Sequence, residues 1–298
     1  MTHFPMAGDA DIAARLRGIA YICLAVFLFT VLDTAAKYAS QAVPTLEVAW
    51  ARYAINLLLA AIVLRPWASL ARYRTGRPIA HAVRALFLLA STVFNFAALR
   101  YLQLAEAVSI TFASPLLVTA IAGPLLGEWA GPRRWAAVIA GFAGVIIILQ
   151  PDPEHFRPEA LFSVAAAVSY AGYALMTRLL SSTESPMAML FFGALLSTLL
   201  LTPAVPAVAV MPPDWIVAAA LLITGIMGTV GHWFLILAYR NAPAMILAPF
   251  HYTQIVWMVA AGYVVFGDWP GPSTMIGATI VIAAGLYVLY RESVRRKD

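Results

Sequence analysis

The chain has 298 residues, of which 62% are apolar and 11% are charged, and its mean hydropathy is +0.84. A soluble globule of this composition would lack the polar surface that it needs, so the sequence predicts an integral membrane protein. The formal charge of +5 lies in short loops and not on a face of a water-soluble element, which argues against a nucleic-acid partner. The single cysteine, Cys23, falls in an apolar stretch, so we expect no disulfide framework and no cysteine-based metal site.

A helix that spans a membrane needs about 20 mainly apolar residues. Ten such stretches follow one another with short connections, so the predicted fold class is an all-α membrane protein with ten transmembrane helices. In chain order they cover residues 18–39, 45–64, 80–101, 103–126, 133–150, 158–180, 186–206, 214–239, 242–266 and 272–290. The first stretch is longer than the apolar core of a secretory signal, about 7–15 residues, so we expect it to be retained.

The basic residues predict the orientation of the chain. With the N-terminus in the cytoplasm, only Lys37, Arg100 and Arg157 fall outside, Arg52 lies within the second stretch, and all other Lys and Arg residues fall inside. By the positive-inside rule, both termini are cytoplasmic. We therefore expect a multi-pass protein of a bacterial-type inner membrane, with a cytoplasmic tail over residues 1–17 and a basic tail over 292–298.

One sequence motif occurs twice, 140 residues apart. Residues 127–132 read Gly-Glu-Trp-Ala-Gly-Pro and residues 267–272 read Gly-Asp-Trp-Pro-Gly-Pro. An offset of 141 also aligns Ala36-Lys37-Tyr38 with Thr177-Arg178-Leu179. The sequence therefore predicts two five-helix repeats, over residues 18–151 and 157–291. Because five is odd, the second repeat enters the membrane from the opposite side, so the repeats are inverted.

These features resemble the drug/metabolite transporter superfamily, in its ten-helix EamA-like branch. The resemblance is carried by the two Gly-acid-Trp turns, by Ala143-Gly144-Val145 and Ala284-Gly285-Leu286, and by Arg52, and it spans nearly the whole chain. It implies an exporter of amino acids or related metabolites that works by alternating access. Overall similarity favours the branch that exports aromatic amino acids. The expected partners are a small-molecule substrate and the lipid bilayer, and the provisional oligomeric state is a monomer.

Two alternatives follow from the same residues. The nearer one is a carrier for another metabolite or a drug; a nucleotide-sugar carrier usually needs cavity cations to meet phosphate, and the predicted midplane contains none. The other is a membrane-embedded enzyme, which would need a nucleophile with its base, paired carboxylates or metal ligands. The five histidines are scattered, so we expect no enzyme activity, no cofactor and no metal.

In inverted-repeat carriers the substrate site lies near the bilayer midplane, where polar side chains halfway along the helices are candidates. Thr111 and Ser114 share a helical face, and so do their repeat equivalents His251 and Gln254. We expect the two pairs to face each other across a pseudo-twofold axis. Thr and Ser can instead bond to carbonyls of their own helix.

Asn95 is a further candidate, because an amide in hydrocarbon must find a partner, either substrate or a neighbouring helix. The other expected substrate-binding residues are Phe29, Thr30, Ser91, Phe94, Tyr170, Tyr173, Met227, Trp233 and Tyr252. For an aromatic amino acid, the ring would stack on such aromatic faces while His251, Gln254 and Asn95 hold the amino and carboxyl ends. Aromatic residues at helical spacing are also compatible with simple packing.

A second group of residues is expected to have structural or gating roles. Gly225, Gly228 and Gly231 form a row that lets helices approach closely or bend. Asp33 and Lys37 can pair along the first helix, near its wet outer end. Arg52 is expected to tie helix ends. No acidic residue lies at the centre of a predicted helix, so exchange down a gradient fits at least as well as proton coupling.

Overall fold

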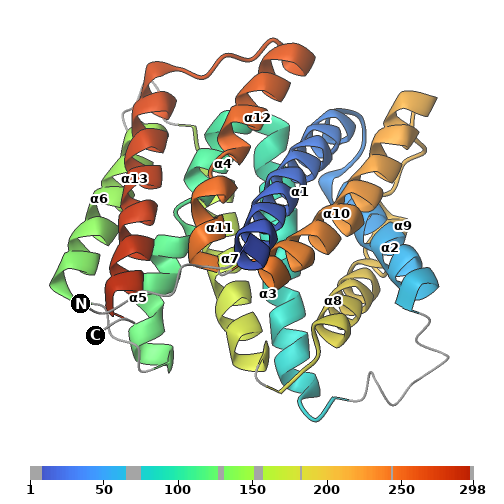
Figure 1. Ribbon diagram of the computed structural model, residues 1–298. Helices are drawn as coiled ribbons and strands as arrows, with labels where there is room; N and C mark the ends of the chain where they lie inside the picture. The colour runs from blue at the N-terminus through green and yellow to red at the C-terminus, as the bar shows by residue number, and fades with distance from the viewer. Residues whose placement is uncertain are drawn as a thin grey trace, which may run out of the picture.

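The computed structural model describes residues 9–64, 75–126, 131–150, 157–181, 183–242 and 244–295. Throughout these residues the secondary structure is helical and no strand occurs (Figure 1). The second Gly-acid-Trp turn lies within this part of the chain. Residues 127–130 of the first turn lie outside it, as do residues 1–8 and 296–298 of the expected tails.

The helices follow the expected order. The first half contains α1 (Asp9–Ala42), α2 (Thr45–Leu64), α3 (Pro78–Tyr101), α4 (Leu104–Thr111), α5 (Ser114–Leu126) and α6 (Pro132–Leu149). The second half contains α7 (Ala160–Ser181), α8 (Pro186–Leu201), α9 (Val205–Val208), α10 (Trp215–Asn241), α11 (Ala244–His251), α12 (Gln254–Ala261), the π-helix η3 (Gly262–Phe266) and α13 (Pro272–Arg295).

Local sequence signals set several helix starts. Pro78, Pro132, Pro186 and Pro272 are each the first residue of a helix, where the proline ring presets the helical φ and the missing N–H is not needed. The side chain of Ser185 accepts a hydrogen bond from the N–H of Ala188, and that of Asp214 accepts one from Val217. These caps satisfy N–H groups that have no partner inside α8 and α10.

Eight helices in the described residues are long and apolar enough to cross a membrane. The expected seventh stretch forms the shorter apolar helix Met187–Leu201. The expected fourth stretch is divided into α4 and α5, although Leu104–Ile121 counts as one of the eight spans, and the expected ninth stretch is divided into α11, α12 and η3. The fold is thus an all-helical membrane architecture, and the count of ten crossings stays a prediction. Helix α1 begins at Asp9, so residues 9–17 of the expected tail continue the helix.

The two halves are closely interleaved. In Figure 1, α1 and α10 lie side by side near the middle of the molecule, and α6 and α13, the last helices of the two repeats, lie side by side at one edge. Glycines permit this second contact, because a Cβ on Gly277 would lie 2.5 Å from the carbonyl oxygen of Gly144. Close backbone approach of this kind replaces the hydrophobic driving force that is missing between helices in lipid.

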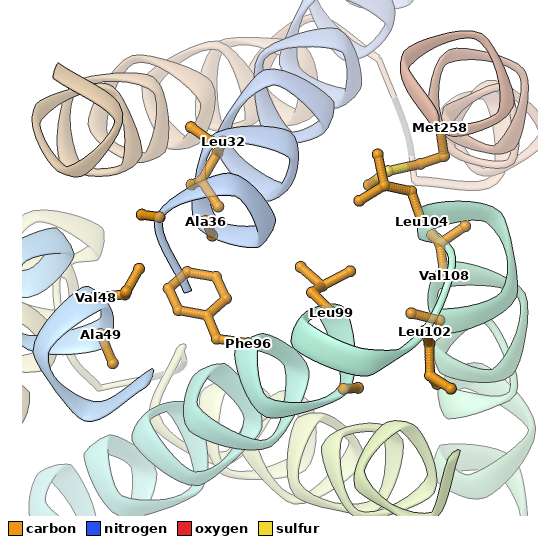
Figure 2. Packing of buried hydrophobic residues seen from close by; sticks show 14 of the residues in the cluster. Leu32, Ala36, Val48, Ala49, Phe96, Leu99, Leu102, Leu104, Val108 and Met258 are labelled. Carbon is orange, nitrogen blue, oxygen red and sulfur yellow. The ribbon is translucent and has the colours of Figure 1, made fainter. Parts of the chain in front are cut away.

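The largest apolar cluster joins the first helices of the first repeat to the second repeat. Figure 2 shows Phe96 of α3 between Ala36 of α1 and Val48 and Ala49 of α2. On the other side of the cluster, Leu104 of α4 points toward Met258 of α12 (Figure 2). These six side chains are at most 1% exposed. The packing therefore fixes α1, α2 and α3 against one another and sets α4 against α12.

Candidate functional site

Two helices are broken at equivalent positions in the two repeats. Helix α4 ends at Thr111 and α5 begins at Ser114, and α11 ends at His251 and α12 begins at Gln254. The residues that border the second break are numbered 140 higher than those that border the first. The four residues that the sequence singled out therefore border the two breaks.

A proline lies near each interruption. Pro115 has no N–H to bond the carbonyl of Thr111, and Pro249, inside α11, cannot donate to the carbonyl four residues before it. Shorter three-residue bonds carry the chain through: the N–H of Ala113 donates to Ile110 O at 3.0 Å, and that of Thr253 donates to Phe250 O at 3.2 Å. Pro115 lies two residues after the first break and Pro249 three residues before the second, a signal that the apolar stretches alone do not reveal.

The two breaks meet. Phe112 and Tyr252, the first residue of each break, have ring centroids 5.0 Å apart with planes at 82°. The ring of His251 lies 6.5 Å from that of Phe112. Equivalent residues in contact mark the local pseudo-twofold relation between the repeats. Among the polar side chains beside the breaks, Thr111 donates a hydrogen bond to Ala107 O of its own helix at 2.9 Å. Ser114 and Gln254 are buried.

Several aromatic and titratable side chains keep accessible surface on helices α1, α7, α10 and α11. Tyr170 is 39% exposed and Tyr239 is 51% exposed, while Asp33, His232 and His251 are half-buried. Four of these five residues are aromatic, and His232 and Tyr239 were not among the candidates from the sequence. Tyr239 lies two residues from the end of α10, near the predicted cytoplasmic end.

Asp33 takes part in a polar cluster that joins α1, α2 and α3. Asn95 Nδ2 donates to Asp33 Oδ1 at 3.1 Å, and Arg52 is the cation that acts electrostatically on this carboxylate. Arg52 Nη1 donates to Thr92 Oγ1 at 3.1 Å, and the guanidinium lies over the rings of Tyr53 and Phe96. Asp33 is nine residues from the end of α1, about 14 Å along the helix, so it lies deeper than the wet helix end that we expected.

Lys37 does not pair with Asp33, contrary to the sequence-based expectation. Its Nζ donates to Leu102 O at 2.6 Å and to Asp268 Oδ2 at 3.1 Å, and it lies 4.9 Å from the centre of the Phe266 ring. Leu102 and Asp268, which come from other parts of the chain, thus take the place of Asp33 as partners of Lys37. Since Asp268 belongs to the second Gly-acid-Trp turn, Lys37 ties the two repeats together at the predicted outer end.

The conformation of that turn explains its other residues. Gly267 has φ +71°, a left-handed conformation that favours glycine, and it ends η3. The N–H groups of Gly267 and Asp268 donate to Tyr263 O and Gly262 O, both at 3.0 Å. Trp269 packs edge-on against Tyr263. The motif is therefore a helix cap that presents its acid to the other repeat.

Arg84 is a second cation inside the bundle. It is 3% exposed and donates to Thr177 Oγ1, to Met189 O and to the hydroxyl of Tyr173. Arg84, which the sequence placed on the cytoplasmic side, lies six residues into α3. The bonds of Arg84 to α7 and α8 are satisfied within the protein, so it holds helices together.

The other candidates fall into two sets. Some are committed to packing: Thr30 bonds to Val26 O of its own helix, Phe94 stacks on Phe162 at 6.5 Å, and Met227 packs on the main cluster. Trp233 is 43% exposed and lies about 200° around α10 from Gly231, away from α1. Of the remaining two, Ser91 is buried on α3, one of the helices of the polar cluster, and Tyr173 is half-buried on α7.

The glycine row of α10 lets α1 and α2 pack closely against it. A Cβ on Gly231 would lie 2.7 Å from the ring of Phe29, and one on Gly228 would lie 3.1 Å from Leu32 and 3.6 Å from Arg52 Nε. Phe29 in turn contacts His232, with ring centroids 5.0 Å apart. The row thus brings Phe29 and Arg52 close to α10.

A family model for the EamA-like transporter family matches the chain twice, over residues 16–150 and 157–291. The chain belongs to the EamA-like transporter family. It is therefore a two-repeat membrane transporter of the drug/metabolite superfamily, and its relatives are transporters and not enzymes. A solved crystal structure that is 20% identical covers 96% of this chain and 99% of its own chain with a TM-score of 0.62, which shows the fold alone.

Three relatives show the range of the family's cargo. A Rickettsia bellii S-adenosylmethionine uptake transporter is 31% identical and covers 92% of this chain and 94% of its own. A Vibrio cholerae riboflavin transporter is 30% identical, covering 93% and 94%, and a Pseudomonas aeruginosa pseudopaline exporter is 26% identical, covering 90% and 94%. These relatives move small metabolites. They do not support the preference for aromatic amino acid export.

Proposed function

We propose that this EamA-like transporter carries a small metabolite with a heteroaromatic ring across the bacterial inner membrane, with S-adenosylmethionine as the first candidate. The contact of the two helix breaks at Phe112 and Tyr252 is the observation that carries the mechanism. Broken helices in inverted repeats free backbone groups at the midplane, where substrates bind, and rocking of the repeats exposes that site to either side.

Aromatic side chains with accessible surface support a ring-bearing substrate. Tyr170, His232, Tyr239 and His251 offer aromatic faces and hydroxyl or imidazole groups. A flat heterocycle can stack on such faces and hydrogen-bond at its edges. Relatives that carry S-adenosylmethionine and riboflavin support the same class of substrate.

The proposed cycle has ten crossings and cytoplasmic termini. Lys37 and Asp268 hold the predicted outer end together at 3.1 Å. Release of this contact would open the outer end. The direction of net flux would then follow the gradients of substrate, which makes uptake and export two uses of one cycle.

Counterflow in liposomes tests the proposal, because it needs no knowledge of the energy source. Purified protein is reconstituted with unlabelled S-adenosylmethionine inside, and entry of labelled S-adenosylmethionine is followed. We expect a transient accumulation above equilibrium that is absent from empty liposomes. Accumulation with riboflavin or tryptophan, and none with S-adenosylmethionine, would reject the first candidate and identify the replacement.

A further inference from the structure

The polar cluster contains two oppositely charged side chains, those of Asp33 and Arg52, that are not bonded to each other. In the described part of the chain, Asp33 and Arg52 do not form an ion pair, although they interact electrostatically. Lys37 is held by Leu102 and Asp268, so it does not neutralise Asp33. Charges in a membrane interior are costly and are expected to be paired or functional.

Each group also has unused hydrogen-bonding capacity. Asn95 occupies Oδ1 of Asp33, and a carboxylate has about four acceptor positions. Arg52 uses Nη1 on Thr92, and its buried Nε has no hydrogen-bond partner. A guanidinium has five N–H donors in a planar fork. The cluster therefore has an acceptor and a donor available for one bridging ligand.

The surroundings of this ligand position include aromatic side chains. Asp33 is half-buried and keeps accessible surface, and Phe29, one turn earlier on α1, contacts His232 of α10. Arg52 is seven residues into α2 and Asn95 is six residues before the end of α3, about 10 Å and 9 Å along their helices. The three groups thus lie at similar depth in the outer half of the bundle.

We propose that Asp33, Asn95 and Arg52 bind the amino-carboxylate end of a zwitterionic metabolite, an inference that rests on the proposed function. The substrate's ammonium bonds to the Asp33 carboxylate, and its carboxylate meets the Arg52 guanidinium. Asn95 orients the Asp33 carboxylate. The ring of the substrate then extends toward His232 and Tyr170. Such a site selects S-adenosylmethionine over riboflavin, which has no amino-carboxylate group.

Thermal stabilisation of the purified protein tests the site independently of transport. The panel pairs S-adenosylmethionine with decarboxylated S-adenosylmethionine and with 5′-methylthioadenosine, and tryptophan with tryptamine. We expect each amino-carboxylate compound to bind at least 10-fold more tightly than its partner that lacks the carboxylate. Arg52→Gln removes this difference, whereas Asp33→Asn weakens binding of every compound that carries an ammonium group.

Two matched variants control for the loss of charge. Asp214→Asn removes a carboxylate but keeps a side chain that caps α10 equally well, and Arg240→Gln removes an exposed cation. Neither should change the ligand ranking. If Arg52→Gln does not fold, Arg52→Lys keeps the charge without the planar fork and should reduce the carboxylate preference.

The outcomes separate the two proposals. If the protein binds tryptophan more tightly than tryptamine but shows no counterflow of S-adenosylmethionine, the proposed substrate is rejected and the site is kept. Counterflow of S-adenosylmethionine with equally tight binding of 5′-methylthioadenosine would keep the function and overturn the site. Wild-type protein that prefers no amino-carboxylate compound, or variants that leave the preferences unchanged, would also overturn it.

Discussion

Phe112 and Tyr252 occupy the same position in the two repeats and touch edge to face across them, with ring centroids 5.0 Å apart. The Tyr252 hydroxyl is buried without a hydrogen-bond partner, against Gly285 of α13. The ring contact, and not the hydroxyl, therefore holds the breaks together.

Substitution of Tyr252 separates these two contributions. Tyr252→Phe keeps the ring and removes an unsatisfied polar group, so we expect an unchanged or higher Tm and normal flux. Tyr252→Ala should cost about 3–5 kcal/mol and lower flux at least 10-fold. Melting curves and counterflow measure both. Equal damage from the two substitutions would show that the hydroxyl has a partner in the working protein.

The glycine row predicts a graded response to added methyl groups. A Cβ at position 225 would lie 2.6 Å from Ile55 Cγ2 and 3.2 Å from Arg52 O, so Gly225→Ala must push α10 from α2. We expect a loss of about 1–3 kcal/mol, as for other overpacked sites. A Cβ at position 228 would lie 3.1 Å from the end of Leu32 and at ordinary contact distance, 3.6 Å, from Arg52 Nε, so Gly228→Ala should cost less. Gly76→Ala meets nothing within 4 Å and is the control for an unchanged Tm.

The turn between α7 and α8 predicts a pH dependence of stability. Burial alone would raise the pKa of Glu184, but the hydrogen bond from Thr75 and the nearby charges of His81 and Arg77 lower it below the ordinary value of 4.5. A lowered carboxyl pKa stabilises the folded state above pH 4.5, and this stabilisation is lost as pH falls through the folded-state pKa. Glu184→Gln should therefore lower Tm at pH 6 and have less effect at pH 4. An equal effect at both pH values would show that the charge does not contribute.

The pair of Lys37 and Asp268 predicts non-additive effects. Lys37 is 8% exposed, so Asp268→Asn leaves a buried ammonium with one partner fewer. We expect Lys37→Met and Asp268→Asn each to lower Tm, and the double variant to be no less stable than the worse single one, with a coupling of about 0.5–3 kcal/mol. The more exposed Arg157 bonded to Glu106 serves as comparison, since Arg157→Gln should cost at most about 1 kcal/mol. Additive losses would mean that the pair does not interact in solution.

The sequence predicted the helices, the duplication and the residues beside the breaks, because apolar length and repeat offset are local properties. The breaks themselves could have been found from Pro115 and Pro249. The partner of Lys37 could not, because Asp268 lies 231 residues away in the chain and a pair with Asp33 satisfies helical spacing equally well. His232 gave no signal by itself, because its contact with Phe29 depends on the packing of α10 against α1.

The most direct test of alternating access is a reversible link across the predicted outer end. Lys37→Cys and Asp268→Cys are combined in a Cys23→Ser background, and a short disulfide-forming crosslinker joins them. Each single cysteine variant with the same reagent is the control. We predict that linked protein loses counterflow and that reduction restores it, while the single variants keep their rates. Linked protein that transports as fast as reduced protein would contradict the account, because the outer end would then not need to open.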